Sequence, residues 1–168
     1  MRRTLLSLIA HWAGGEIHGD DVAIDAISND TRQMSPGSLY VALRGERFDG
    51  HDFGTDAQAR GASALLVERL LPLNLPQVLV ADSELALARI AAGMQRDRST
   101  GVFAITGSNG KTSVKQLVAA ILSRHAPTSF NPGNFNNEIG LPLAVLDAPE
   151  DAVFAVYEMG AGKPGDIA

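Results

Sequence analysis

The clearest chemical pattern lies between residues 102 and 113, where an apolar run is followed by small residues and then by Lys111, Thr112 and Ser113. Small residues let backbone N–H groups point at an anion, and a helix starting there adds partial positive charge. A lysine can then reach the terminal phosphates of a nucleotide, and a hydroxyl can contact phosphate-bound Mg²⁺. We therefore expect a nucleotide phosphate site made of Gly107, Ser108, Asn109, Gly110, Lys111, Thr112 and Ser113.

This turn departs from the common P-loop pattern. That pattern has a glycine five residues before Gly110, where this chain has Ile105, and the additional glycine is Gly107. The alternative is a glycine-rich turn between strand and helix with a chance Gly-Lys-Thr. We prefer the phosphate site because the strand, turn and helix patterns all agree with it.

Two later segments carry groups suited to the same chemistry. Glu158 ends an apolar run from 153 to 157, and a carboxylate at a strand end beside a phosphate site is typical of a Mg²⁺ ligand. Residues 131–142 contain four asparagines, whose amides can donate to phosphate oxygens, and we assign Asn134 and Asn137 to the ATP site. A solvated glutamate and a plain asparagine-rich loop are the alternatives.

Two polar loops near the N-terminus suit a diphosphate. Ser28, Thr31 and Arg32 lie in the first, and Asp49 and His51 lie in the second. A guanidinium offers a planar fork of donors, and hydroxyls add short ones. Solvated turns with local hydrogen bonds explain both loops about as well, and a capping role is more common for a histidine such as His51.

Composition excludes several classes of protein. The 168 residues carry a net charge of −5 without clusters of Lys and Arg, so we expect no nucleic-acid partner. The absence of cysteine excludes disulfides and thiolate metal sites. No apolar run approaches the roughly 20 residues of a membrane span, so we expect no membrane insertion. Basic residues precede an apolar stretch at the N-terminus, as in a secretory signal. The apolar residues of this stretch recur at helical spacing, however, and favour a helix that ends at Gly14.

The predicted fold class is α/β. We expect a small α/β substrate domain over residues 1–97 and, over 98–168, the start of a P-loop-type parallel-sheet ATP-binding domain that is incomplete. We predict strands at 22–24, 39–43, 64–67, 77–80, 102–105, 128–130 and 153–160, and helices at 5–12, 55–61, 83–95 and 112–124.

Several of these motifs together resemble the Mur ligases of peptidoglycan synthesis. They are residues 107–115, 133–142, 158–161 and 165–167, joined near the N-terminus by 30–32, 36–37, 39–43 and 49–53. The resemblance covers nearly the whole chain. It implies a cytoplasmic, monomeric ATP-dependent amide ligase in which Lys111 and Glu158 act electrostatically, Thr112 and Glu158 hold Mg²⁺, and the two N-terminal loops bind the UDP end of the substrate.

Within the family, Lys115 and the Asn-Asn-Glu-Ile-Gly loop are most similar to the member that joins D-alanyl-D-alanine to UDP-N-acetylmuramoyl-tripeptide. The resemblance implies that ATP phosphorylates the terminal carboxylate and that the amine then attacks the acyl phosphate. We also expect the 168-residue chain to be inactive alone, because a doubly wound domain needs more strands than it has.

Other functions remain open at this stage. The sister ligase that adds the third peptide residue shares the phosphate site. A non-catalytic nucleotide or UDP-sugar binding module would use the same loops. A regulatory switch protein would need an Asn-Lys-x-Asp segment to recognise the base, and this sequence has none. A folate or cyanophycin type of ligase would lack the N-terminal loops.

Overall fold

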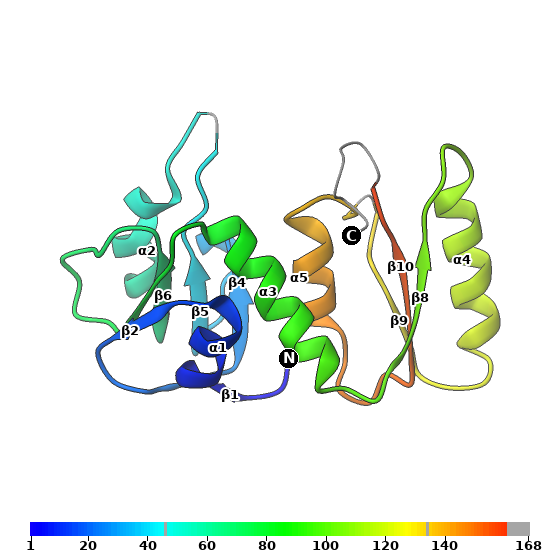
Figure 1. Cartoon of the computed structure of the whole chain (residues 1–168), viewed down its shortest axis with the longest axis horizontal. Helices are drawn as coiled ribbons and strands as arrows, with labels where there is room; N and C mark the ends of the chain where they lie inside the picture. Colours follow the sequence, from blue (N-terminus) through cyan, green and yellow to red (C-terminus); the bar gives the residue numbers. More distant parts are fainter. Residues whose placement is uncertain (46, 134, 161–168) are drawn as a thin grey trace. The chain divides into compact units, whose positions relative to one another are not determined.

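The chain divides into two units, Met1–Ile90 and Ala91–Ala168. The computed structural model describes residues 1–45, 47–133 and 135–160, and Figure 1 shows the elements of each unit. The division falls inside helix α3 (Ser83–Arg96). The predicted domain boundary after residue 97 follows the end of this helix and stays a prediction.

Unit 1 contains a five-stranded sheet in the order β2-β7-β6-β5-β4. Strands β4 (Ala26–Ser28), β5 (Ser38–Val41), β6 (Ala64–Val67) and β7 (Gln77–Leu79) are parallel, and β2 (Glu16–His18) pairs antiparallel with β7. A separate antiparallel pair joins β1 (Thr4–Leu5) to β3 (Ala23–Ile24). Strand β4, which ends at Ser28 of the first polar loop, is at the edge of the large sheet.

The centre of this sheet is buried on both faces. Successive residues of a strand point to opposite faces, yet every residue of β5 and β6 is buried. On one face Tyr40 and Leu65 pack with Ala57 of α2 (Gly54–Ala59). Continuous burial is typical of parallel strands covered on both sides, and it confirms the predicted α/β fold of this unit.

The helices of unit 1 begin and end close to the predicted residues. Helix α1 (Leu6–Ala13) ends at Gly14, which has a φ of +69°. A left-handed residue at a helix end favours glycine. Helix α3 begins where the Asp82 carboxylate accepts a hydrogen bond from the Leu85 N–H at 2.9 Å. Two short 3₁₀ helices, Thr31–Gln33 and Gly50–Phe53, lie in the two polar loops.

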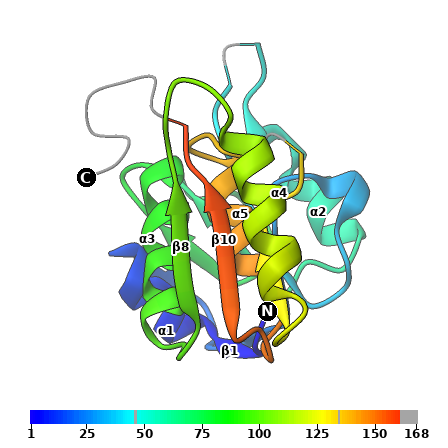
Figure 2. The same ribbon diagram turned by 90° about the vertical axis from the view of Figure 1, so that its right-hand side faces the viewer.

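Unit 2 contains a three-stranded parallel sheet in the order β8-β10-β9. Its strands are β8 (Gly101–Ile105), β9 (Thr128–Phe130) and β10 (Phe154–Glu158). Figures 1 and 2 show α4 (Lys111–Leu122) on one face of this sheet and α5 (Gly140–Asp147) on the other. The predicted parallel sheet, opened by a strand, a turn and a helix, is confirmed.

Four strands and helices of the described residues were not predicted from the sequence, besides the two 3₁₀ helices. They are β1, β2, β4 and α5. Ser28, which the sequence places in a polar turn, is the last residue of β4. Helix α5 contains Pro142, which is compatible with a helix because it lies in the first turn, where its missing N–H has no helical partner. Among the described residues, no helix is both long and apolar enough to cross a membrane.

Candidate functional site

The glycine-rich turn between β8 and α4 has the geometry expected of a phosphate site. Gly107 and Gly110 have φ values of +147° and +75°, a region that favours glycine. Ser108 and Asn109 lie between them, and α4 begins at Lys111 with no acidic residue in its first turn. The partial positive charge of the helix N-terminus is therefore available to an anion.

The side chains at the start of α4 are held in different ways. The Lys111 ammonium is exposed and donates to the Gly107 carbonyl at 2.8 Å. The Thr112 hydroxyl donates to Oε2 of Glu158 at 2.9 Å. Ser113 is exposed in the first turn of the helix. The structure thus brings Thr112 and Glu158 together, as the metal-site prediction requires.

Glu158 is buried at the end of the central strand β10, with 4% of its surface exposed. Its Oε1 accepts a hydrogen bond from the Asn136 amide at 2.9 Å. Burial opposes ionisation, but hydrogen bonds from Thr112 and Asn136 and the nearby charge of Lys115 outweigh it and lower the pKa of Glu158. The carboxylate is therefore ionised at neutral pH.

Two buried side chains of unit 2 support this carboxylate. The Lys115 ammonium donates to the carbonyls of Asn131 and Gly133 at 2.8 and 3.0 Å and lies 3.5 Å from Oε2 of Glu158. The Asn131 side chain accepts from the Glu158 N–H and donates to the Glu158 carbonyl, both at 2.9 Å. Asn131 therefore continues the hydrogen bonding of β9 with β10 beyond the last residue of β9.

The oxygen atoms of this site fit Mg²⁺. A hydroxyl and an ionised carboxylate are hard oxygen ligands, which Mg²⁺ prefers together with phosphate oxygens and water. Among the residues that the structure describes, no group of three or more His, Cys, Asp or Glu side chains is arranged to hold a metal by itself. A metal here would bind through Thr112, Glu158 and the nucleotide.

Of the two asparagines predicted for the ATP site, the structure describes Asn137. Asn134 lies outside the described residues. The Asn137 side-chain oxygen accepts from the Gly140 N–H at 2.7 Å, so it caps the start of α5. The asparagine that contacts Glu158 is Asn136. Asn131, Asn136 and Lys115 were not in the predicted site. The sequence signal that could have identified Lys115 is its position one helical turn after Lys111.

The N-terminal candidates gather at one edge of the sheet in unit 1. The loops after β4, β5 and β6 all follow the carboxyl ends of parallel strands, an edge where α/β proteins commonly bind ligands. The charges of Asp30 and Asp49, from two of these loops, both act on the buried Tyr40. Burial is the largest cause that raises the pKa of Tyr40, to about 12.

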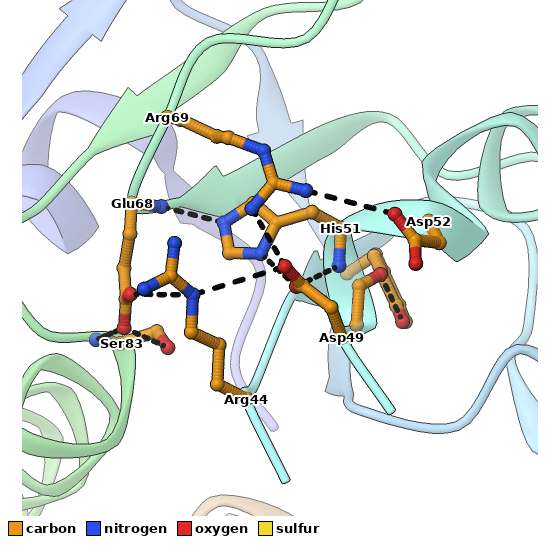
Figure 3. A network of polar contacts seen from close by, with 9 residues as sticks. Arg44, Asp49, His51, Asp52, Glu68, Arg69 and Ser83 are labelled. Atoms are coloured by element: carbon orange, nitrogen blue, oxygen red, sulfur yellow. Dashed lines mark hydrogen bonds and ion pairs between the residues drawn. The ribbon is translucent and has the colours of Figure 1, made fainter. Parts of the chain in front are cut away.

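A polar network fixes the second of these loops (Figure 3). The His51 Nδ1 donates to Oδ1 of Asp49 at 2.5 Å, and its Nε2 accepts from the Glu68 N–H at 2.8 Å. Both ring nitrogens are thus used, and the His51 side chain is fully buried. Arg69 donates to Oδ2 of Asp49 at 2.7 Å. The geometry favours the structural role for His51 over direct contact with a ligand.

The first loop is built around Asp30. Its carboxylate accepts from Nε and Nη2 of Arg32 at 2.9 and 2.7 Å and from the Arg32 N–H at 2.9 Å. These hydrogen bonds lower the pKa of Asp30 to about 2. The Ser28 hydroxyl also bonds to the backbone of Asp30, at 3.1 Å, and Thr31 lies in the 3₁₀ helix. The Arg32 side chain remains 80% exposed.

Sequence reasoning missed the third member of this edge, the loop after β6. Glu68 accepts from the N–H and hydroxyl of Ser83 at 3.0 and 2.9 Å and lies 3.3 Å from Nε of Arg44. Figure 3 shows Glu68 and Arg69 facing the residues of the second loop. Their position directly after a buried strand is the signal that could have identified them.

Models of two protein domains match most of the residues of the chain. Residues 23–95 match the Mur ligase family, catalytic domain, and residues 105–167 match the Mur ligase middle domain. A UDP-N-acetylmuramoyl-tripeptide–D-alanyl-D-alanine ligase of Escherichia coli (strain K12) is 47% identical over 163 residues. That match covers 97% of this chain and 36% of the relative. The ligase of the same name from Bacillus subtilis (strain 168) is 40% identical and covers 88% of this chain and 33% of the relative.

Solved structures agree with these matches. MurF from Acinetobacter baumannii superposes with a TM-score of 0.90 at 33% identity, covering 98% of this chain and 38% of that one. MurF ligase from Thermotoga maritima in complex with ADP gives 0.78 at 36% identity, covering 84% of this chain and 33% of that one. The chain thus spans about a third of the length of the relatives it matches. On these family matches and these structural neighbours, the chain belongs to the Mur ligase family.

Proposed function

We propose that this chain carries the substrate-binding and phosphate-binding parts of an ATP-dependent ligase of peptidoglycan precursor synthesis. The ligase would join D-alanyl-D-alanine to UDP-N-acetylmuramoyl-tripeptide through an acyl phosphate. The observation that carries the proposal is the 2.9 Å hydrogen bond from Thr112 to Glu158 beside the glycine turn. It joins a phosphate-site hydroxyl to an ionised, buried carboxylate, as a Mg·ATP site requires. The names of the relatives and the ADP complex support the same reaction.

The residues of unit 2 would act by position and charge. Phosphoryl transfer depends on orienting the phosphates and neutralising the charge that develops on them. Lys111 is partly exposed and, among the described residues, its ammonium donates one hydrogen bond, so it can turn from the Gly107 carbonyl to a phosphate oxygen. The turn and the N-terminus of α4 would supply N–H donors to the phosphates. Bound Mg²⁺, held by Thr112 and Glu158, would add charge neutralisation.

The residues of unit 1 would bind the UDP end of the substrate. Arg32 presents an exposed guanidinium after β4, and Arg44 and Arg69 are partly exposed after β5 and β6. A guanidinium suits a diphosphate because it donates in a planar fork. Asp30, Asp49 and the buried His51 would hold these loops in place, while Ser28 and Thr31 would shape the first of them.

Two other functions make different predictions. The sister ligase that adds the third peptide residue is disfavoured, because a UDP-N-acetylmuramoyl-L-alanyl-D-glutamate–2,6-diaminopimelate ligase matches at only 22% identity and a TM-score of 0.55, which shows the fold alone. A non-catalytic UDP-sugar module would bind the UDP substrate without binding Mg·ATP.

Calorimetric titration of the chain with Mg·ATP tests the proposal. We expect Mg·ATP to bind, and the Lys111→Ala variant to lose most of this affinity while remaining folded. Arg124→Ala is the matched control, because it removes an exposed cation just beyond the other end of α4. Unchanged affinity in folded Lys111→Ala would show that the glycine turn is not the phosphate site.

A thermal-shift comparison tests the substrate assignment. UDP-N-acetylmuramoyl-tripeptide should raise the melting temperature of the chain, and Arg32→Ala should reduce that rise. ATP should give a larger shift than GTP. A chain stabilised by the UDP substrate but not by Mg·ATP would support the non-catalytic module, and a chain stabilised by neither would contradict the proposal.

A further inference from the structure

Lys115 is a buried charged group to which the proposed function gives no role. It lies on α4 one helical turn after Lys111, and only 2% of its surface is exposed. Lysine is rarely buried to this extent unless its charge is paired, because removing an ammonium from water is costly. The Lys115 ammonium lies among acceptors from two segments of unit 2: the carbonyls of Asn131 and Gly133, and the carboxylate of Glu158.

The geometry shows that this lysine differs from Lys111. An ammonium has three N–H donors. Two are used by the carbonyls of Asn131 and Gly133, at 2.8 and 3.0 Å, and Oε2 of Glu158 lies 3.5 Å away. No donor is left for a phosphate. Lys111 is more exposed and has one hydrogen bond.

The same acceptors belong to groups that orient Glu158. Asn131 contributes its carbonyl to Lys115 and pairs with the backbone of Glu158 through its side chain. Asn131 also donates to the Phe135 carbonyl at 2.6 Å, next to the asparagine that contacts Oε1 of Glu158. Lys115 thus lies next to Oε2 of Glu158. It also bonds the carbonyls of Asn131 and Gly133, which come shortly before Asn136, the donor to Oε1 of Glu158.

We infer that Lys115 is a positioning residue for the metal site. It holds Glu158 and the described residues Asn131, Gly133 and Asn136 in the arrangement that presents the carboxylate to Thr112. The inference rests on the proposed function, in which Glu158 and Thr112 hold Mg²⁺. It differs from a simple counter-charge role, in which the ammonium only neutralises a buried carboxylate and competes with the metal.

The test compares ATP affinity with Mg²⁺ and with EDTA in Lys115→Met. Loss of a group that orients a metal ligand typically weakens metal binding about 10–100-fold. We therefore expect Lys115→Met to lose at least about tenfold of the Mg²⁺-dependent gain in ATP affinity, with metal-free affinity changed less than about threefold. Gln116→Met is the matched control, because it places the same side chain at the next, exposed position of α4.

A second measurement needs no nucleotide. The amides of Glu158 and Gly160 donate to Asn131 and to the Asn136 carbonyl, at 2.9 and 2.7 Å. If Lys115 holds this segment, hydrogen exchange at both amides should accelerate at least about tenfold in Lys115→Met, since local opening becomes easier. Should Lys115→Met not fold, Lys115→Gln takes its place in the comparison with Mg²⁺ and with EDTA only, because its amide can still donate to the two carbonyls and so does not test the exchange prediction.

The results of these two measurements distinguish a failure of the proposed function from a failure of the positioning role of Lys115. Wild-type chain that shows no Mg²⁺-dependent ATP binding would contradict the proposed function. Wild-type binding with an unchanged or larger Mg²⁺-dependent gain in the Lys115 variant would overturn the positioning role, because a competing counter-charge would have been removed. Unchanged exchange at Glu158 and Gly160 would also overturn it.

Discussion

A carboxylate with a lowered pKa lies at the centre of a polar network in each unit, Asp49 in unit 1 and Glu158 in unit 2, and the two carboxylates differ in the kind of partners that bond them. Asp49 in unit 1 accepts from the ring of a buried histidine and from Arg69. Glu158 in unit 2 accepts from a threonine hydroxyl and an asparagine amide beside the glycine turn. The side chain of Asp49 is 30% exposed, whereas that of Glu158 is 5% exposed.

This difference indicates that Asp49 is an anchor, a residue that fixes the structure of its loop, whereas Glu158 is a candidate metal ligand. At Asp49 the exposed groups are the arginines around it, so the carboxylate fixes a loop and the guanidinium groups face outward. At Glu158 the hydroxyl of Thr112 and the amide of Asn136 are neutral donors, and under the proposed function a cation would replace the hydrogen bond from Thr112. Substitutions at the first network should therefore affect folding, and those at the second should affect metal-dependent binding.

The largest expected effect is on stability in unit 1. His51→Ala removes a fully buried ring and leaves the Glu68 N–H without its partner, while Oδ1 of Asp49 keeps the hydrogen bond from the backbone N–H of residue 51. The cavity and the unsatisfied N–H should lower the free energy of unfolding by about 2–4 kcal/mol. Denaturant unfolding of the chain measures this, with the exposed His125→Ala as the control. A loss no larger than that of the control would remove the contrast between anchor and ligand.

The second effect concerns Glu158. Glu158→Gln keeps the shape of the side chain but removes the charge that would bind the metal. The Mg²⁺-dependent gain in ATP affinity should fall at least about tenfold, equivalent to ~1.4 kcal/mol. Affinity in EDTA should change less. Titrations with and without metal decide it, and equal losses in both would show that the carboxylate does not act through a metal.

Local sequence patterns predicted the parts of the fold that depend on local structure. The continuous apolar run 64–67 gives β6 with the predicted bounds, and Gly14 ends α1 as expected. Strand β2 was missed because its three residues, Glu16–His18, lack an apolar run and depend on pairing with β7. Helix α5 was missed because an asparagine-rich stretch precedes it and Pro142 lies inside it.

The candidate site was predictable where its residues are consecutive. Lys111 and Thr112 follow the glycine turn in sequence, so their placement needs only a strand, a turn and a helix. The supporting contacts join residues far apart in the chain: Asn131 meets Glu158 only because β9 pairs with β10 in one register. A single sequence does not fix that register, so neither Asn131 nor the role of Lys115 could be predicted from it.

A smaller effect, dependent on pH, is expected at Asp49. Hydrogen bonds from Arg69 and from the His51 N–H hold the pKa of Asp49 well below its ordinary value of 3.8. A carboxylate with a lowered folded pKa adds stability that is fully present above the unfolded pKa and disappears as pH falls below it. The difference in unfolding free energy between wild type and Asp49→Asn should thus be constant from about pH 7 to 5 and shrink below about pH 4. A difference that grows on acidification would contradict the assignment.

The smallest effect is expected at Asp30, where the network is open to water. Hydrogen bonds from Arg32 lower the pKa of Asp30 from 3.8 to about 2, so its contribution should be complete above about pH 4 and be lost between about pH 4 and 2. Because Arg32 is 80% exposed, water and salt screen the pair, and Asp30→Asn should destabilise the chain less than Asp49→Asn at every pH. The measurement is acid unfolding of both variants in low and in high salt, with the exposed Asp20→Asn as the control. High salt should remove a larger share of the Asp30 effect than of the Asp49 effect, since Asp49 is bonded to a fully buried histidine. If salt reduces both effects by the same share, Asp49 behaves as a surface charge. Asp49 and Glu158 would then differ in solvent exposure and not in structural role.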